Sequence, residues 1–142
     1  MKYLILQASV GLLLSTNALG VENQINCPAE YSGKDIQLTN VPKGWLAVPP
    51  SRLLLTSAIV ILGPPQERGV LKGEHYKLNK KGAYEVRFTN LNSGIQYEKW
   101  IACGYGQDDF ELAQPLAPHT AQCIVTYTPD RQGMFDIKAV CK

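Results

Sequence analysis

The run Arg52–Leu62, RLLLTSAIVIL, carries the strongest fold signal in this 142-residue chain. Leu, Ile and Val fill most of its positions, so the run is too apolar for a strand with one face in water. It predicts a central strand buried on both faces. A short buried helix is the alternative interpretation, but the β-branched end of the run and the Gly63-Pro64-Pro65 stop after it favour the strand.

Later runs alternate between apolar and polar side chains, which is typical of half-buried strands. In residues 84–89, YEVRFT, the residues Tyr, Val and Phe alternate with Glu, Arg and Thr. Comparable runs occupy residues 97–105, 110–112, 123–128 and 134–141, with turn-forming residues between the last of them. The sequence therefore predicts an all-β fold, a single small antiparallel β-sandwich or barrel-like domain without long helices. The polar, glycine-rich residues 63–82 are predicted to form a surface loop or irregular excursion.

Residues 1–20 have the features of a secretory signal peptide. Lys2 precedes an apolar stretch of about a dozen residues, and the small residues Ala18 and Gly20 flank Leu19. A buried N-terminal helix and a membrane anchor are the alternatives, but the stretch is short for a bilayer span. We therefore predict cleavage after Gly20, a mature domain of residues 21–142, and a periplasmic or secreted protein without a stable membrane anchor.

All four cysteines, Cys27, Cys103, Cys123 and Cys141, follow the predicted leader. An even number of cysteines in a small exported chain predicts two disulfides. A zinc site needs closely spaced ligands, and the nearest cysteines are 18 and 20 residues apart, so we expect neither a metal nor a cofactor. Among the alternative pairings we favour Cys103–Cys123, which closes a compact segment, and Cys27–Cys141, which joins the two ends of the mature domain.

The charge of the chain excludes one class of partner. The formal net charge is +2, and removal of the leader with Lys2 lowers it to +1. A nucleic-acid-binding protein usually carries a basic stripe, which this sequence lacks. We therefore expect no nucleic-acid partner.

Several short motifs make the mature region resemble a known family. They are Ile25-Asn26-Cys27-Pro28, Gly44-Trp45, Gly63-Pro64-Pro65, Trp100-Ile101-Ala102-Cys103-Gly104-Tyr105, Leu112 to Leu116 around Pro115, and Cys123 with Tyr127. The chain resembles a family of small, mostly uncharacterised exported proteins of Gram-negative bacteria. The resemblance implies a periplasmic domain with paired cysteines, and it brings no established reaction with it.

The sequence contains no recognisable catalytic motif. His75 lies in the polar stretch, His119 follows Pro118 in a turn, and neither belongs to a nucleophile elbow. The adjacent Asp108 and Asp109 would serve acid–base chemistry only opposite a further carboxylate, and such a pair is more typical of a turn. We therefore expect a protein that is not an enzyme.

Binding through loops is the function that these features favour, because a rigid, disulfide-braced sheet can present its loops to a partner. The expected partner-binding residues lie in the polar stretch and in the turn at residues 106–109: Arg68, Glu74, His75, Tyr76, Asp108 and Asp109. Tyr and Arg are enriched at interface hot spots. Trp45 and Trp100 are expected in the core, with an apolar groove as the alternative.

We therefore predict an exported, non-enzymatic binding protein, a monomer or small oligomer, that inhibits or neutralises a protein partner such as an envelope-targeting toxin or hydrolase. One form of this hypothesis is a lysozyme inhibitor. Ser93-Gly94-Ile95-Gln96-Tyr97 is similar to the Ser-Gly-x-x-Tyr loop of such inhibitors, but the rest of that pattern is missing. The alternatives are a small envelope hydrolase that uses His75 or His119, and a structural component of a surface assembly.

Overall fold

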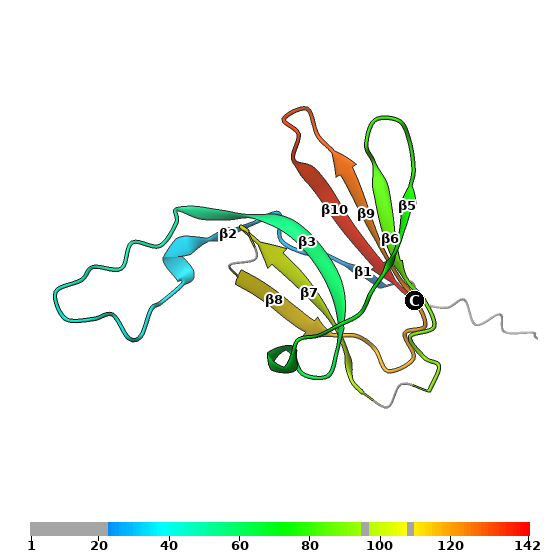
Figure 1. Ribbon diagram of the computed structural model, residues 1–142, viewed down its shortest axis with the longest axis horizontal. Coiled ribbons are helices and arrows are strands. Elements are labelled where there is room, and N and C mark those ends of the chain that lie inside the picture. Colours follow the sequence, from blue (N-terminus) through cyan, green and yellow to red (C-terminus); the bar gives the residue numbers. More distant parts are fainter. Residues whose placement is uncertain (1–22, 95–96, 108–109) are drawn as a thin grey trace, which may run out of the picture.

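The structure is a computed structural model that describes residues 23–94, 97–107 and 110–142 (Figure 1). Within these ranges the chain forms β-strands and two short 3-10 helices, η1 (Gly33–Asp35) and η2 (Pro65–Glu67). The all-β prediction is confirmed. The predicted leader, residues 1–20, lies outside the described residues. Among the described ones, no helix has the length and apolar character needed to cross a membrane.

The strands form two antiparallel sheets. The first sheet has the order β1 (Asn23–Ile25), β10 (Phe135–Cys141), β9 (Cys123–Pro129), β6 (Tyr84–Phe88), β5 (Glu74–Lys77). The second sheet has the order β2 (Glu30–Ser32), β3 (Arg52–Leu62), β7 (Lys99–Tyr105), β8 (Phe110–Pro115), and β4 (Gly69–Val70) also pairs with β3. The turns of the β5–β6 and β9–β10 hairpins point away from the second sheet in Figure 1.

β3 is the central strand of the second sheet, as its apolar run predicts. β2 pairs with its first residues, β4 with its last and β7 with most of its length. Leu53, Leu55 and Val60 enter the core, whereas Ile59 is half-buried and Thr56 is exposed. Burial on both faces is therefore only partial, because the first sheet covers just one face of this strand.

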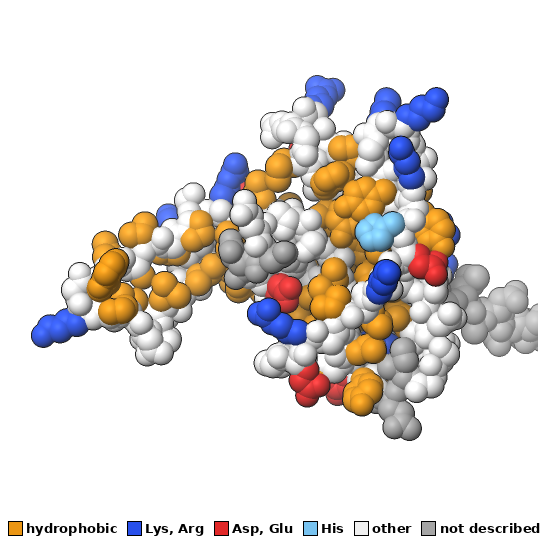
Figure 2. All heavy atoms as spheres, viewed as in Figure 1, with side chains coloured by type: hydrophobic (Ala, Val, Ile, Leu, Met, Phe, Trp, Pro, Cys, Tyr) orange, Lys and Arg blue, Asp and Glu red, His pale blue; other side chains and the backbone are white. Residues whose placement is uncertain are grey.

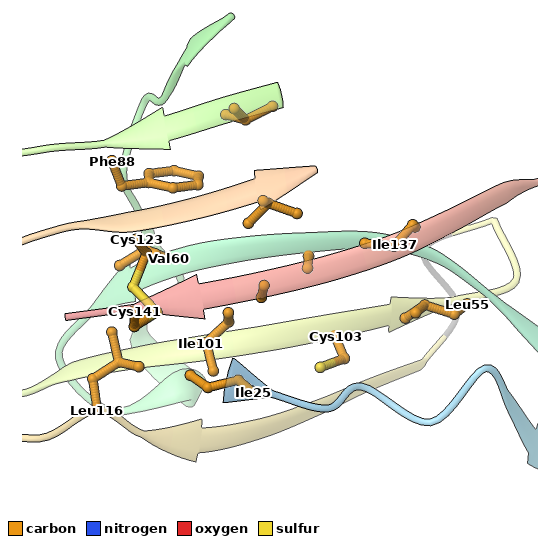
Figure 3. Packing of buried hydrophobic residues seen from close by; sticks show 14 of the residues in the cluster. Ile25, Leu55, Val60, Phe88, Ile101, Cys103, Leu116, Cys123, Ile137 and Cys141 are labelled. Atoms are coloured by element: carbon orange, nitrogen blue, oxygen red, sulfur yellow. A yellow bond between two sulfur atoms is a disulfide. The ribbon is translucent and has the colours of Figure 1, made fainter. Parts of the chain in front are cut away.

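The core lies between the two sheets and includes Val60 and Ile101 of the second sheet and Phe88 and Ile137 of the first (Figure 3). Tyr127 of β9 also links the sheets through its hydroxyl, which accepts a hydrogen bond from the Ala58 amide and donates one to the Ala58 carbonyl, both at 3.2 Å. Ala58 lies on β3 between the residues that pair with β2 and those that pair with β4. Tyr127 thus satisfies backbone groups that neither short strand reaches. Burial raises the pKa of Tyr127, and its hydrogen bond with the Ala58 backbone acts in the opposite direction.

The two disulfides are Cys27–Cys103 and Cys123–Cys141. The prediction that all four cysteines are paired is confirmed, but the favoured pairing of Cys103 with Cys123 and of Cys27 with Cys141 is wrong. Cys123 and Cys141 lie directly opposite each other on β9 and β10, with their Cα atoms 4.1 Å apart. Cys103 lies on β7 of the other sheet, where it meets the segment that leads from β1 to β2.

Residues 63–82 are more ordered than the expected surface loop. They contain η2, β4 and β5, and β5 pairs with β6 from Glu74↔Arg87 to Lys77↔Tyr84. All four residues of β5 are exposed, so the strand has no apolar alternation that would reveal it in the sequence. Gly73 precedes β5, and a Cβ atom there would lie 2.3 Å from Val86 Cγ1, so glycine allows the chain to approach β6 closely.

Candidate protein-binding surfaces

Three of the residues predicted to bind a partner lie together on β5, at the end of the first sheet. Glu74, His75 and Tyr76 are consecutive and exposed. Because side chains alternate along a strand, Glu74 and Tyr76 share one face of the sheet and His75 lies on the other. We call these residues, together with Lys77 of β5 and Tyr84, Glu85 and Arg87 of β6, the edge surface.

On the face with Tyr76, a small polar network fixes the aromatic ring. The Tyr76 hydroxyl donates to Glu74 Oε2 at 2.5 Å, and the Arg87 guanidinium lies 4.2 Å from the centre of the Tyr76 ring. Arg87 also forms an ion pair with the buried Glu85. The hydrogen bond to Glu74 raises the pKa of Tyr76, with the charge of Glu74 acting in the same direction. Tyr76 is thus held in place although 39% of it is exposed.

On the opposite face, His75 continues a stack of aromatic rings. His75 stacks on Tyr84 with ring centres 6.1 Å apart, and Tyr84 stacks on Tyr127 at 4.5 Å. Phe135 meets Tyr84 edge-on at 5.6 Å. His75, Tyr76, Lys77 and Tyr84 line an open hollow of about 400 Å³. Together with Glu74 and the Glu85–Arg87 pair, these residues give the edge surface aromatic rings and both signs of charge.

The other predicted partner-binding residues are not part of the edge surface. Arg68 is exposed and adopts a left-handed backbone conformation, with φ of 51°, at the end of η2. It precedes β4, which pairs with β3, and so belongs to the second sheet. Asp108 and Asp109 lie outside the described residues, as do Ile95 and Gln96 of the segment similar to lysozyme inhibitors. Within the described ranges, no group of three His, Cys, Asp or Glu side chains is placed to hold a metal ion.

A second exposed surface, which the sequence reasoning missed, is the long connection between β2 and β3. Residues 37–49, which we call the arm, project from the second sheet (Figure 1). Its base is closed by the pairing of Ser32 with Arg52 and by a hydrogen bond from the Gly33 amide to the Ser51 carbonyl. A Cβ atom on Gly33 would lie 1.6 Å from the Pro50 carbonyl oxygen, so this close approach requires glycine.

The arm carries large apolar side chains in water. Trp45 is 76% exposed, Leu46 85% and Val48 82%, and orange side chains cover much of the arm in Figure 2. The expectation that Trp45 belongs to the core is therefore wrong, whereas Trp100 is half-buried on β7. The sequence did contain a signal for this exposed connection. Apolar residues are interspersed there with Pro42, Gly44 and two further prolines, a combination that is incompatible with the regular apolar spacing of a strand or helix.

Most of the chain matches a known protein family. The family model for the type VI secretion system Tli immunity protein matches residues 50–142. This region runs from the residue after the arm's end to the C-terminus and contains β3 to β10. Neither the curated proteins nor the solved structures contain a match to the chain.

Proposed function

The chain belongs to the family of type VI secretion system Tli immunity proteins, which neutralise Tle lipase effector toxins, and we propose that it contacts its effector through the edge surface. Proteins of this family are not enzymes and bind their cognate Tle effectors. The sequence hypothesis of a protein that neutralises a toxin is therefore confirmed. The resemblance to a mostly uncharacterised family is corrected, because the family has a known role in immunity.

The observation that carries the assignment of the edge surface is the fixed, exposed ring of Tyr76. Aromatic and arginine side chains dominate the energetics of protein interfaces, and Tyr76 and Arg87 lie here in direct contact. A side chain that is already held in place loses little conformational entropy when a partner binds. Glu74 and Arg87 place opposite charges beside the ring, which favours a partner with a complementary arrangement.

The position of β5 at the end of its sheet is a second reason to assign effector binding to the edge surface. Along the described part of the first sheet, β5 is the last strand, so one side of its backbone is not paired with another strand. Such an edge can accept an extended segment of a partner through backbone hydrogen bonds, with the side chains on both faces providing specificity.

Tyr76→Ala should weaken the binding of the cognate Tle effector by about 30-fold or more, because truncation of a hot-spot aromatic typically costs about 2 kcal/mol or more. Isothermal titration calorimetry with the purified effector measures this. Tyr97→Ala is the matched control, since Tyr97 is 68% exposed and lies two residues before β7 of the second sheet. An unchanged affinity for Tyr76→Ala, with thermal unfolding as for the wild type, would contradict the assignment of the edge surface.

We further propose that the chain acts in the periplasm, where Tli immunity proteins are typically found. The signal-peptide features of residues 1–20 and the two disulfides support this location, because disulfides form and persist in oxidising compartments.

Intact-mass analysis of the protein from a periplasmic fraction tests the location. The mass should correspond to a chain that begins at Val21 and contains both disulfides. Recovery only from the cytoplasm, with Met1 retained and reactive thiols, would rule out this location.

A further inference from the structure

We propose that the arm enters the lipid-binding cleft of the lipase effector and occupies the space that an acyl chain of the substrate would fill. This inference rests on the proposed function and assigns to the arm a role separate from that of the edge surface. The edge surface would hold the effector, and the arm would block its chemistry.

The arm concentrates exposed apolar side chains. Eleven large hydrophobic residues are exposed in the described part of the chain, and five of them lie in the arm: Leu38, Val41, Trp45, Leu46 and Val48. The one charged residue in the arm is Lys43. A soluble protein rarely keeps such a patch in water unless a partner covers it.

The arm also has the shape of an inserted element. The segments that lead into and out of the arm are held together at its base, beside Gly33. The two ends of the arm are therefore fixed, and its tip projects from the domain. At the tip, the Trp45 amide donates to the Pro42 carbonyl at 3.0 Å, and Gly44 takes a φ of +87°, which together make a tight turn. Five residues of the arm precede this turn and four follow it, so the arm reaches about 15 Å when extended.

The fold does not need the arm side chains. The hydrophobic core and the side chains packed against it include Ile36 but none of residues 37–49. Residues 37–42 and 45–47 instead surround an apolar hollow of about 610 Å³ on the arm itself. An apolar element that contributes nothing to the core is available for a partner.

A lipase cleft is the partner surface that this chemistry fits. A lipase must hold acyl chains, so its substrate cleft is necessarily apolar, and the arm offers apolar side chains without a carboxylate. The family match begins at residue 50, where the arm has ended. The arm, like β1 and β2 before it, therefore lies outside the part that matches the family model.

The test compares binding with inhibition for two variants of the mature chain. In one, a short Gly-Ser turn replaces residues 37–49; the other is Trp45→Ser with Leu46→Ser. Val70→Ser is the matched control, because Val70 is 60% exposed and lies outside the arm. Calorimetry measures binding of the cognate effector. Hydrolysis of phospholipid vesicles is then measured at saturating immunity protein.

We expect both arm variants to bind through the edge surface and to leave the effector in the saturated complex largely active. The wild type and Val70→Ser should leave it inactive. A saturated, inactive complex with the arm-shortened chain would overturn the inference and leave the proposed function intact. If the wild type fails to bind the effector, the inference about the arm and the proposed function are both contradicted.

The same variants distinguish a membrane contact from a lipase contact. Sedimentation with vesicles of phosphatidylethanolamine and phosphatidylglycerol is measured without effector. If the wild type sediments with these vesicles through the arm, while both arm variants still inhibit the effector fully, the arm contacts the membrane and the inference is wrong. Absence of arm-dependent sedimentation, together with the loss of inhibition, supports insertion into the cleft.

Discussion

Replacement of both Cys27 and Cys103 by serine should lower the free energy of unfolding by about 4.5 kcal/mol, because this disulfide closes a loop with a sequence separation of 76 residues. Loss of the cross-link increases the conformational entropy of the unfolded chain, and the effect grows with loop length. The bond also fixes the segment between β1 and β2 onto β7, where the Tyr105 hydroxyl donates to the Pro28 carbonyl at 3.0 Å. A domain of this size has a total stability of about 5–15 kcal/mol, so the variant should be barely folded at 37 °C.

Denaturant unfolding followed by circular dichroism measures this loss. The matched control is the replacement of Cys123 and Cys141 by serine, which removes a cross-link with a separation of 18 residues and should cost about 3 kcal/mol. Thiol titration adds a check on connectivity, since the Cys27 and Cys103 variant should retain an intact Cys123–Cys141 bond and show no reactive thiol. A larger loss for the short loop, or free thiols in this variant, would contradict the pairing.

The strands with a strong apolar pattern could be predicted from the sequence. Arg52–Leu62 forms β3 with the bounds of the apolar run, and β10 (Phe135–Cys141) begins one residue inside the predicted run at residues 134–141. Side chains that point toward the core are apolar in these segments, so the apolar pattern of the sequence indicates where each strand lies. β8 extends to Pro115, beyond the predicted run at residues 110–112, because backbone pairing with β7 continues there.

The disulfide connectivity could not be predicted in the same way. The connectivity depends on the sheet to which each strand belongs. Only β8 separates β7 from β9 in the sequence, but β7 belongs to the second sheet and β9 to the first. Cys103 and Cys123 therefore lie apart, whereas Cys123 and Cys141 are brought together by the register of one hairpin. Strand order is a tertiary property that short-range spacing does not encode.

The candidate binding surfaces could likewise be predicted only in part from the sequence. Glu74, His75 and Tyr76 could be predicted as exposed residues of the polar stretch, and Tyr76 as a residue type enriched at interfaces. Their strand, their opposite faces and the contact of Tyr76 with Arg87 depend on pairing with β6. The arm was missed because an apolar residue such as Trp45 is more often found in a core, and only the structure shows that this segment leaves the domain.

Inhibition of the lipase is the second effect that we expect to be large. At effector concentrations well above the dissociation constant, each equivalent of the mature chain should inactivate one equivalent of effector, because an immunity protein must act before membrane lipids are cleaved. Natural inhibitor complexes of this kind reach nanomolar dissociation constants or below, so residual activity at one equivalent should be on the order of a few per cent. The chain reduced and unfolded in denaturant, then diluted with its thiols blocked, is the control and should not inhibit.

Titration of the purified cognate Tle effector with the purified mature chain, with phospholipid hydrolysis as the readout, therefore tests the central claim most directly. The expected result is a linear fall in activity that ends near one equivalent of immunity protein. Activity that stays unchanged in a tenfold excess of the folded, disulfide-bonded chain would contradict neutralisation of a lipase effector by direct binding.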